Sequence, residues 1–414
     1  LGIVGDATIT IPLLRGSGRH IIMEPLTQAE RNVIYAIWEF ERFRQILAVD
    51  IAREYVDVLR KLNEVENAAE NYRNLIVSSR RSRRLADAGR ATEVEVNQAL
   101  QNELRARNRW VSARELYKGR MDAFKRLLGL PPDAEILLDR GDLDRLLTLS
   151  FQIKDDMARE SRVSADQKVP PADASIELVE PSNENAGPME MDPFIAAKLA
   201  LENRLDLRVS DGKVYDAQRK VIVAADALGA ELTLFGSARL GEGRTIATAN
   251  LDDARLRTDR GIYSALLTLD LPFERTAERN AYRKSFITLE KAVRDVQKLE
   301  DEIKLSIRNK LRAMYEARES RQIQARALLV AETRVKSTTL FFEAGRIQIR
   351  DLLEAQEALV NARNALTSAV VDYRVAELEF QRDAGVLQLD ENGLWVEYSP
   401  EGLKNGKQQD PSSQ

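Results

Sequence analysis

The stretch from Phe341 to Gly385 reads FFEAGRIQIRDLLEAQEALVNARNALTSAVVDYRVAELEFQRDAG, and its pattern decides the fold. A glycine turn opens it, and a long helical run follows. Two apolar series each repeat every seven residues in that run, the second set three residues after the first: Leu352, Leu359, Leu366, Tyr373 and Phe380, then Ala355, Ala362, Ala369 and Ala376. Alternating spacings of three and four residues are typical of helices packed side by side at a shallow angle. We therefore expect this helix to return along a neighbouring helix.

The same pattern occurs earlier in the chain. A shift of 256 residues, the difference between 345 and 89, places the turn Ala88-Gly89-Arg90 on Ala344-Gly345-Arg346. Without a gap, the same shift aligns two further sets of identical residues: Ala106, Arg107, Asn108, Tyr117, Phe124, Arg126 and Gly129 with Ala362, Arg363, Asn364, Tyr373, Phe380, Arg382 and Gly385. Matches in one register over this length predict an internal duplication, whose unit is a helix, a glycine turn and a returning helix.

Two other segments are predicted to be unusually long helices. Residues 27–86 read as one helix of roughly 60 residues, which is about 90 Å long. Residues 276–342 read as another of roughly 67 residues, which is about 100 Å long. We expect Thr27 to cap the first of them, with Glu30 closing a capping box. Shorter helices are expected at 92–128, at 193–229 and near 143–149. Helices of such length need lateral partners, because isolated helices are marginal in water.

Three segments alternate apolar and polar residues, which predicts strands at 6–14, 231–240 and 262–273. The second strand, for example, places Leu232 on one face and Thr233 on the other. A length of about ten residues with one apolar face is what a membrane barrel strand requires. Because a strand edge cannot stay unpaired in lipid, such strands have to close into a barrel through oligomerisation. A strand facing an aqueous core shows the same alternation, so the pattern alone leaves both interpretations open.

Composition argues against several classes of function. The chain has 414 residues, of which 31% are charged and 6% aromatic, and its net charge of −4 does not point to nucleic acid. It contains no cysteine and no run of about 18 apolar residues. His20 is the only histidine and is expected in a turn formed by residues 15–20. The sequence has no metal-ligand set, Gly-x-Ser-x-Gly or phosphate-binding loop. We therefore expect no catalysis, no metal and no cofactor.

The elements predict four regions. Residues 1–130 form a first repeat, and residues 131–192, rich in Pro, Asp, Glu, Ser and Asn, form an insertion. Residues 193–389 form a second repeat that reads helix, strand, polar loop, strand, long helix, glycine turn and returning helix, and residues 390–414 form a polar tail. The first repeat lacks the opening helix and strand of the second, and we expect these upstream of Leu1.

In this order of elements the chain resembles the TolC family of outer-membrane efflux and secretion ducts over nearly all of residues 1–390. The segments that carry the resemblance are AGRATEVEVNQA, AGRIQIRDLLEAQ, ENRLDL, AELTLFG and LTLDLPF. The resemblance implies a mainly α fold with a small membrane β-barrel part. In it, long antiparallel helical hairpins from a homotrimer form an α-helical barrel in the periplasm, and four strands from each protomer close a twelve-stranded β-barrel in outer-membrane lipid. The expected location is the outer membrane of a Gram-negative-type cell.

The resemblance also implies candidate functional residues at the two glycine turns. These turns, Ala88-Gly89-Arg90 and Ala344-Gly345-Arg346, are expected to form the periplasmic tips that dock a periplasmic adaptor protein and, through it, an inner-membrane pump. Glu95, Asp351 and Glu354 align with the family's acidic positions, so three protomers would bring them into a cation-selecting ring at the entrance. Alternatively, the acids simply favour a helix N-terminus, and Arg350 pairs with Asp351.

Two other classes of protein stay open on the sequence alone. A soluble coiled-coil scaffold explains the helices but not the paired strands. The periplasmic adaptor of such a pump also contains helical hairpins, but it requires a lipoyl-like β motif, and none is visible in the sequence. The nature of the transported substrate, small molecule or protein, is not encoded in any motif.

Overall fold

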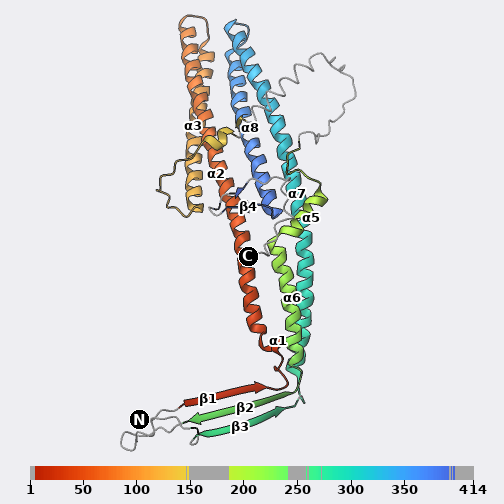
Figure 1. The fold of residues 1–414 in the computed structure, drawn as a ribbon. Coiled ribbons are helices and arrows are strands. Elements are labelled where there is room, and N and C mark those ends of the chain that lie inside the picture. The colour runs from red at the N-terminus through yellow and green to blue at the C-terminus, as the bar shows by residue number, and fades with distance from the viewer. Residues whose placement is uncertain are drawn as a thin grey trace, which may run out of the picture. The chain divides into compact units, whose positions relative to one another are not determined.

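The fold is described from a computed structural model, which defines residues 5–145, 147–148, 186–240, 258, 261–271, 273–390, 393 and 395–396 (Figure 1). Its named elements are β1 (Gly5–Pro12), α1 (Arg19–Ile22), α2 (Glu24–Asp87), α3 (Glu93–Leu127), α5 (Pro193–Asn203), α6 (Leu205–Asp226), β2 (Glu231–Leu240), β3 (Ile262–Asp270), α7 (Thr276–Glu343), α8 (Ile349–Asp383), β4 (Gln388–Leu389) and β5 (Trp395–Val396). Residues 141–145 and 147–148 are also helical, where the short helix is predicted. Most of the predicted insertion, the polar loop after β2 and the tail lie outside the described residues.

The chain divides into two compact units. One unit combines Leu1–Arg42 with Leu205–Glu302 and contains the three-stranded sheet, α6 and the first turns of α2 and α7. The other combines Phe43–Arg204 with Ile303–Gln414 and contains the hairpins α2–α3 and α7–α8. None of the helices within the described ranges has both the length and the apolar content that a membrane crossing requires.

The sheet is antiparallel in the order β1-β2-β3, and its two faces differ in chemistry. The register places Ile11 opposite Leu234, which in turn lies opposite Leu267, so these share one face. On the other face, Ser237 and Ser264 share a hydrogen bond of 2.8 Å, and Arg239 donates to Asp6 at 2.7 Å. The predicted alternation is thus confirmed, with two exceptions on the polar face, where Phe235 lies opposite Leu266 and Ile262 lies opposite Arg239.

The two long helices are confirmed, and each hairpin reverses at a glycine. α2 has 64 residues and α7 has 68. The glycines after the four hairpin helices all have a positive φ, between 67° and 72°: Gly89, Gly129, Gly345 and Gly385. At the first turn the amide of Arg90 donates to the Leu85 carbonyl, and the amide of Gly89 donates to Ala86. These two hydrogen bonds satisfy carbonyl groups in the last turn of the helix. They require a left-handed backbone conformation at residue 89, which glycine tolerates best.

The repeat of 256 residues is visible in this backbone geometry. Gly345 and Gly385 lie 256 residues after Gly89 and Gly129, and each closes its helix with the same pair of hydrogen bonds. The predicted heptad seam is buried along α8, where Phe380 and Ala355 are fully buried. Within the second hairpin, Leu366 of α8 packs with Ala325 and Leu328 of α7. The sequence therefore places the helix-packing seam correctly.

Three sequence predictions are wrong in detail. Thr27 does not cap α2, because that helix begins at Glu24 and the Thr27 amide already donates to Met23 at 2.9 Å. His20 lies in the short helix α1 rather than in a turn. The helix predicted at 193–229 is broken at Arg204, which separates α5 from α6.

The backbone at the break is in close contact with the turn after α8. A Cβ atom added to Gly385 would lie 3.0 Å from the carbonyl carbon of Asn203 and 3.1 Å from the nitrogen of Arg204. The turn after α8 therefore packs directly on the backbone at the end of α5. Such a contact is possible only because residue 385 has no side chain.

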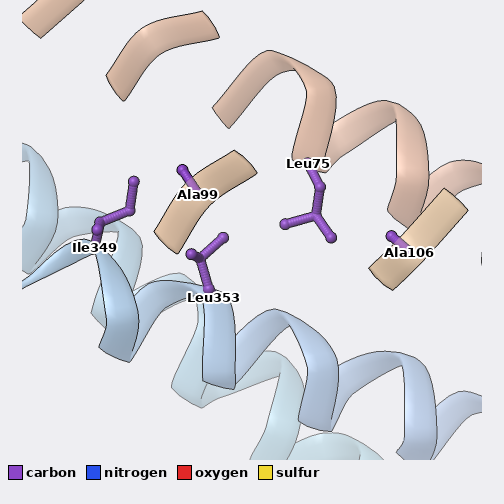
Figure 2. Close-up of a cluster of buried hydrophobic side chains, with 5 residues drawn as sticks. All are labelled: Leu75, Ala99, Ala106, Ile349 and Leu353. Atoms are coloured by element: carbon purple, nitrogen blue, oxygen red, sulfur yellow. The ribbon is translucent and has the colours of Figure 1, made fainter. Parts of the chain in front are cut away.

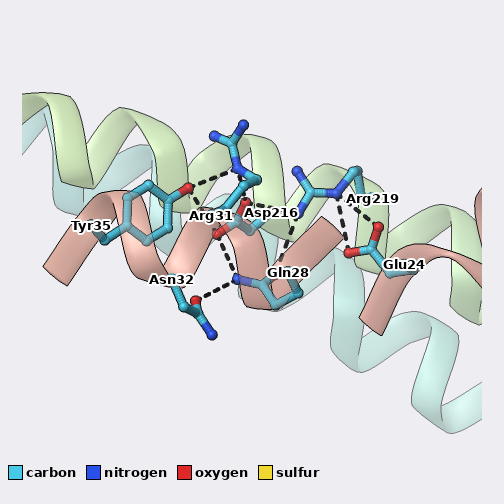
Figure 3. Close-up of polar contacts among 7 residues, drawn as sticks. All are labelled: Glu24, Gln28, Arg31, Asn32, Tyr35, Asp216 and Arg219. Atoms are coloured by element: carbon cyan, nitrogen blue, oxygen red, sulfur yellow. Dashed lines mark hydrogen bonds and ion pairs between the residues drawn. The ribbon is translucent and has the colours of Figure 1, made fainter. Parts of the chain in front are cut away.

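A polar network ties α6 to the first turns of α2 (Figure 3). The Asp216 carboxylate is 4% exposed and accepts hydrogen bonds from Arg31 at 2.8 Å and Tyr35 at 3.0 Å. Gln28 and Arg219 donate to the same carboxylate, and Arg219 also bonds Glu24 at 2.8 Å. Burial raises the pKa of Asp216, but the hydrogen bonds from Gln28 and Tyr35 and the charge of Arg219 outweigh it, so the net pKa lies below its usual value.

Substitution of Gly385 is expected to be more damaging than the same substitution at Gly129. Both have a φ near +71°, so Gly385→Ala and Gly129→Ala each carry a left-handed strain of about 1–2 kcal/mol. Only Gly385 has backbone within 4 Å of the added Cβ, and that overlap adds about 1–3 kcal/mol. Thermal unfolding followed by helical circular dichroism measures the difference. Equal thermal midpoints for the two variants would show that the α5–α8 contact is not tight.

The Asp216 network is expected to make stability depend on acidity. Because the folded-state pKa of Asp216 is lowered, its contribution is present above the unfolded value of about 3.9 and is lost as the pH falls through the folded value. Asp216→Asn should lower the stability by about 1–3 kcal/mol at neutral pH, since it leaves Arg31 without its anion and Arg219 with Glu24 alone. The difference in free energy of unfolding between the variant and the wild type should become smaller below about pH 4. Asp211→Asn, an exposed change on the same helix, is the control. A gap that is constant with pH would contradict this account.

Candidate functional site

The two hairpin turns are accessible, as docking tips have to be. Every residue of Ala88-Gly89-Arg90 and of Ala344-Gly345-Arg346 is exposed. A Cβ atom at Gly89 or Gly345 would meet no atom within 4 Å, so these glycines are required by backbone conformation and not by crowding. The space around both turns is therefore open on this chain.

Just behind the turns, the two hairpins pack on each other (Figure 2). Leu75 of α2, Ala99 and Ala106 of α3, and Ile349 and Leu353 of α8 form one buried cluster. Small alanines on α3 let α8 approach closely, as the heptad seam predicts. The cluster fixes the position of the first turns of α8 relative to α3, and these turns carry the candidate acids.

A polar groove of about 250 Å³ borders this cluster. α3 contributes Arg105 and Arg109 to its lining, and α8 contributes Arg350, Glu354 and Glu357. Arg109 pairs with Glu357 at 2.5 Å, which joins the two hairpins across the groove. Acidic and basic groups are thus mixed here, and the described residues contain no group of three or more His, Asp or Glu side chains placed to hold a metal ion.

The first candidate acid, Glu95, is committed to a structural task. Its carboxylate accepts a hydrogen bond from the Thr92 amide at 2.8 Å, and the Glu95 amide donates to the Thr92 hydroxyl at 3.3 Å. This reciprocal pair is a capping box that satisfies the first amides of α3. The Thr-x-x-Glu spacing directly after the glycine turn is the sequence signal that identifies it.

The equivalent acid of the second repeat has no such task. By the shift of 256 residues, Gln348 replaces Thr92 and Asp351 replaces Glu95. Gln348 makes no side-chain capping bond, so α8 begins without a capping box. Asp351 lies in the first turn of α8 and is half-buried. Among the described side chains no ion pair joins it to Arg350, and its carboxylate is not used to close the helix.

The third candidate acid, Glu354, is held by a basic residue that the sequence analysis did not single out. Arg334 of α7 pairs with Glu354 at 2.9 Å, and both side chains are substantially exposed. An exposed pair of this kind contributes about 0.2–1 kcal/mol, so it directs the carboxylate more than it stabilises the hairpin. The three acids therefore differ: one caps a helix, one is paired and one is uncommitted.

Comparisons with known proteins agree with this fold. No protein-family model and no curated protein sequence matches the chain. Among solved structures, CusC, described for its transmembrane channel formation, superposes with a TM-score of 0.66 at 13% identity, over 93% of this chain and 83% of its own. The CmeC outer-membrane channel of Campylobacter jejuni gives a TM-score of 0.65 at 14% identity, over 99% of this chain and 81% of its own. The open state of the MtrE outer-membrane channel of Neisseria gonorrhoeae gives a TM-score of 0.63 at 12% identity, over 93% of this chain and 81% of its own.

At these identities the similarity establishes the fold. The chain has the fold of outer-membrane channel proteins, which is the fold that its resemblance to the TolC family predicts.

The first turns of the return helices α3 and α8 are expected to differ in stability between the two repeats. Thr92→Ala removes the capping box and should cost about 1 kcal/mol, with about fivefold faster hydrogen exchange in the first turn of α3. The double change Gln348→Thr with Asp351→Glu should have the opposite effect on α8, because it builds the missing box. Hydrogen exchange read by mass spectrometry tests both. No change at either helix would show that these helix ends are held by packing alone.

Proposed function

We propose that this chain is one protomer of an outer-membrane exit duct of the TolC family, in which three copies enclose a path from the periplasm to the cell exterior. The sheet is the observation that carries this proposal. Its apolar face is open, with Ile9 59% and Leu267 60% exposed, whereas its polar face makes hydrogen bonds of its own. An outward apolar face with an inward polar face is the arrangement of a strand between lipid and a water-filled pore.

The proposed assembly follows from the edges of that sheet. Within the described part of the chain, β1 and β3 each pair with β2 alone. Open edges are not stable in lipid, so strands of other copies complete the hydrogen bonding. Four strands from each of three copies form the proposed twelve-stranded barrel, of which β1, β2 and β3 are three.

The proposed partner contacts are at the hairpin turns. Exposure of both turns supports a role in docking a periplasmic adaptor and, through it, an inner-membrane pump. The cargo is a small molecule or a protein, carried through the duct without chemical change. The long α2 and α7 support a tunnel that spans the periplasm, since each is about 100 Å long.

The proposed gate depends most on Asp351. Carboxylates from three copies that converge on one constriction attract cations and repel each other. No described side chain pairs with Asp351, whereas Arg334 neutralises part of the charge of Glu354 and the capping box holds Glu95. We therefore assign Asp351 the main contribution to the ring, Glu354 a smaller one and Glu95 the least.

Bilayer recordings on the full-length protein test both the duct and the gate. Wild-type protein in detergent should have the mass of three chains and should form cation-selective channels. Asp351→Asn should reduce cation selectivity and block by large cations more than Glu354→Gln does, because the Glu354 charge is already partly neutralised by Arg334.

Glu357→Gln is the matched control, since Glu357 lies on α8 with Asp351 and Glu354, is paired with Arg109 of α3 and is not proposed to face the pore. A stable water-soluble monomer would refute the duct. Conducting trimers whose selectivity is unchanged by Asp351→Asn would refute the gate alone.

A further inference from the structure

A band of arginines covers the last turns of α2 and continues into the first tip. Its members, called here the arginine band, are Arg80, Arg81, Arg83, Arg84 and Arg90. All five are exposed. Ser82, in the middle of the run, is only 2% exposed. Because a helix turns about 100° per residue, the arginines cover the half of the helix that faces away from the buried Ser82.

Most of this charge is not neutralised by other residues in the described part of the chain. Arg83 lies 3.6 Å from Asp87 and 3.9 Å from Glu93, which are weak, exposed pairs. Arg81 lies 3.9 Å from Glu343 and stacks over the ring of Phe342. Among the described residues, Arg80, Arg84 and Arg90 have no acidic side chain within ion-pair distance. The band therefore presents at least three guanidinium groups to a partner.

The second repeat shows that the fold does not require three of these five charges. The shift of 256 residues puts Ser337, Thr339 and Leu340 at the positions of Arg81, Arg83 and Arg84, whereas Lys336 and Arg346 keep a basic residue at the positions of Arg80 and Arg90. Thr339 donates its hydroxyl to the Val335 carbonyl, and Leu340 is 59% exposed. Yet α7 ends in the same glycine turn with the same paired hydrogen bonds as α2. Cations that merely complement a helix dipole would be expected at both helix ends.

A second copy of this chain is a poor match for the band. The region around the other tip, residues 334–351, is itself basic: it carries Arg334, Lys336, Arg346 and Arg350 against Glu343 and Asp351. Like charges brought together across an interface are unfavourable. An arginine-rich surface instead selects carboxylates, because the planar guanidinium donates two parallel hydrogen bonds to a carboxylate.

We infer that the arginine band is a docking surface for an acidic helical-hairpin tip on the adaptor, so that recognition of the partner at the first hairpin depends on charge. The inference rests on the proposed function and specifies the chemistry of its partner. The band supplies the cations and the partner supplies Asp or Glu side chains. Docking by exposed charges is weakened by salt.

The test is a charge reversal in the full-length protein within the cells that produce it. Arg80→Glu, Arg84→Glu and Arg90→Glu together should lower export by about tenfold or more, which corresponds to about 1.4 kcal/mol of lost docking energy. The matched control reverses Arg73, Arg107 and Arg114, which are exposed on the same hairpin but lie outside the band. It changes the net charge equally and should leave export close to the wild-type rate.

Suppressor selection then identifies the partner surface. Restored export should come from changes of Asp or Glu to Lys or Arg in the adaptor gene. Suppressors confined to this chain, or loss of the trimer in the reversed variant, would mean that the band contacts a second copy and would overturn the inference. So would export at the wild-type rate.

The inference and the proposed function fail in different ways. Channel conductance of the reversed trimer should equal that of wild type, because the band lies on the docking surface and not on the proposed pore. Absent conductance in wild-type protein would count against the duct itself. The Gln versions of the same three changes are a second test, because they remove charge without adding repulsion. These should still reduce export, and an unchanged rate would overturn the inference.

Discussion

The backbone groups on the free edges of β1 and β3 set the condition that the rest of the molecule has to meet. Both strands pair with β2 only, within the described part of the chain. In lipid each unsatisfied amide or carbonyl costs several kcal/mol, and in water an open apolar sheet invites aggregation. Closing the sheet with strands from other copies removes both difficulties. In the proposed trimer, the helices that follow stand beside those of the other copies.

Much of this architecture could be predicted because it is encoded in periodicity. The bounds of β2 match the predicted segment, and the alternation along β1 and β3 gives the correct faces. β3 ends at Asp270 instead of at Phe273, and Pro272, which lacks an amide to donate, is the residue that sequence reasoning should have weighed there. The heptad series gives the buried face of α8 because packing, unlike capping, is repeated many times along the helix.

The failures occur where a single contact decides the structure. No proline or glycine in the sequence marks the break at Arg204. In the structure, Gly385 packs against the end of α5 at this point, and local sequence patterns do not reveal such a distant contact. The start of α2 at Glu24 overrides the capping motif at Thr27, because the helix gains turns that connect it to α6 through Glu24 and Arg219. At the candidate site, the turns could be predicted from glycine spacing, but the pairing of Glu354 with Arg334 could not, because it depends on how α7 and α8 are aligned.

The first turns of α2 show how one helix serves both the chain and its assembly. On one face Tyr35 is 7% exposed, and its ring occupies the space where a side chain at Gly212 of α6 would lie. On the opposite face Leu26, Val33, Ile37 and Phe40 are each more than half exposed. Their spacing of three, four and seven residues forms one stripe, and a contiguous apolar stripe of this kind marks an interface. Burying one such side chain gives about 1.5–3 kcal/mol, so four of them outweigh any exposed ion pair in the structure. The face with Tyr35 thus maintains the fold of the chain, and the stripe supplies cohesion between neighbouring copies in the proposed trimer.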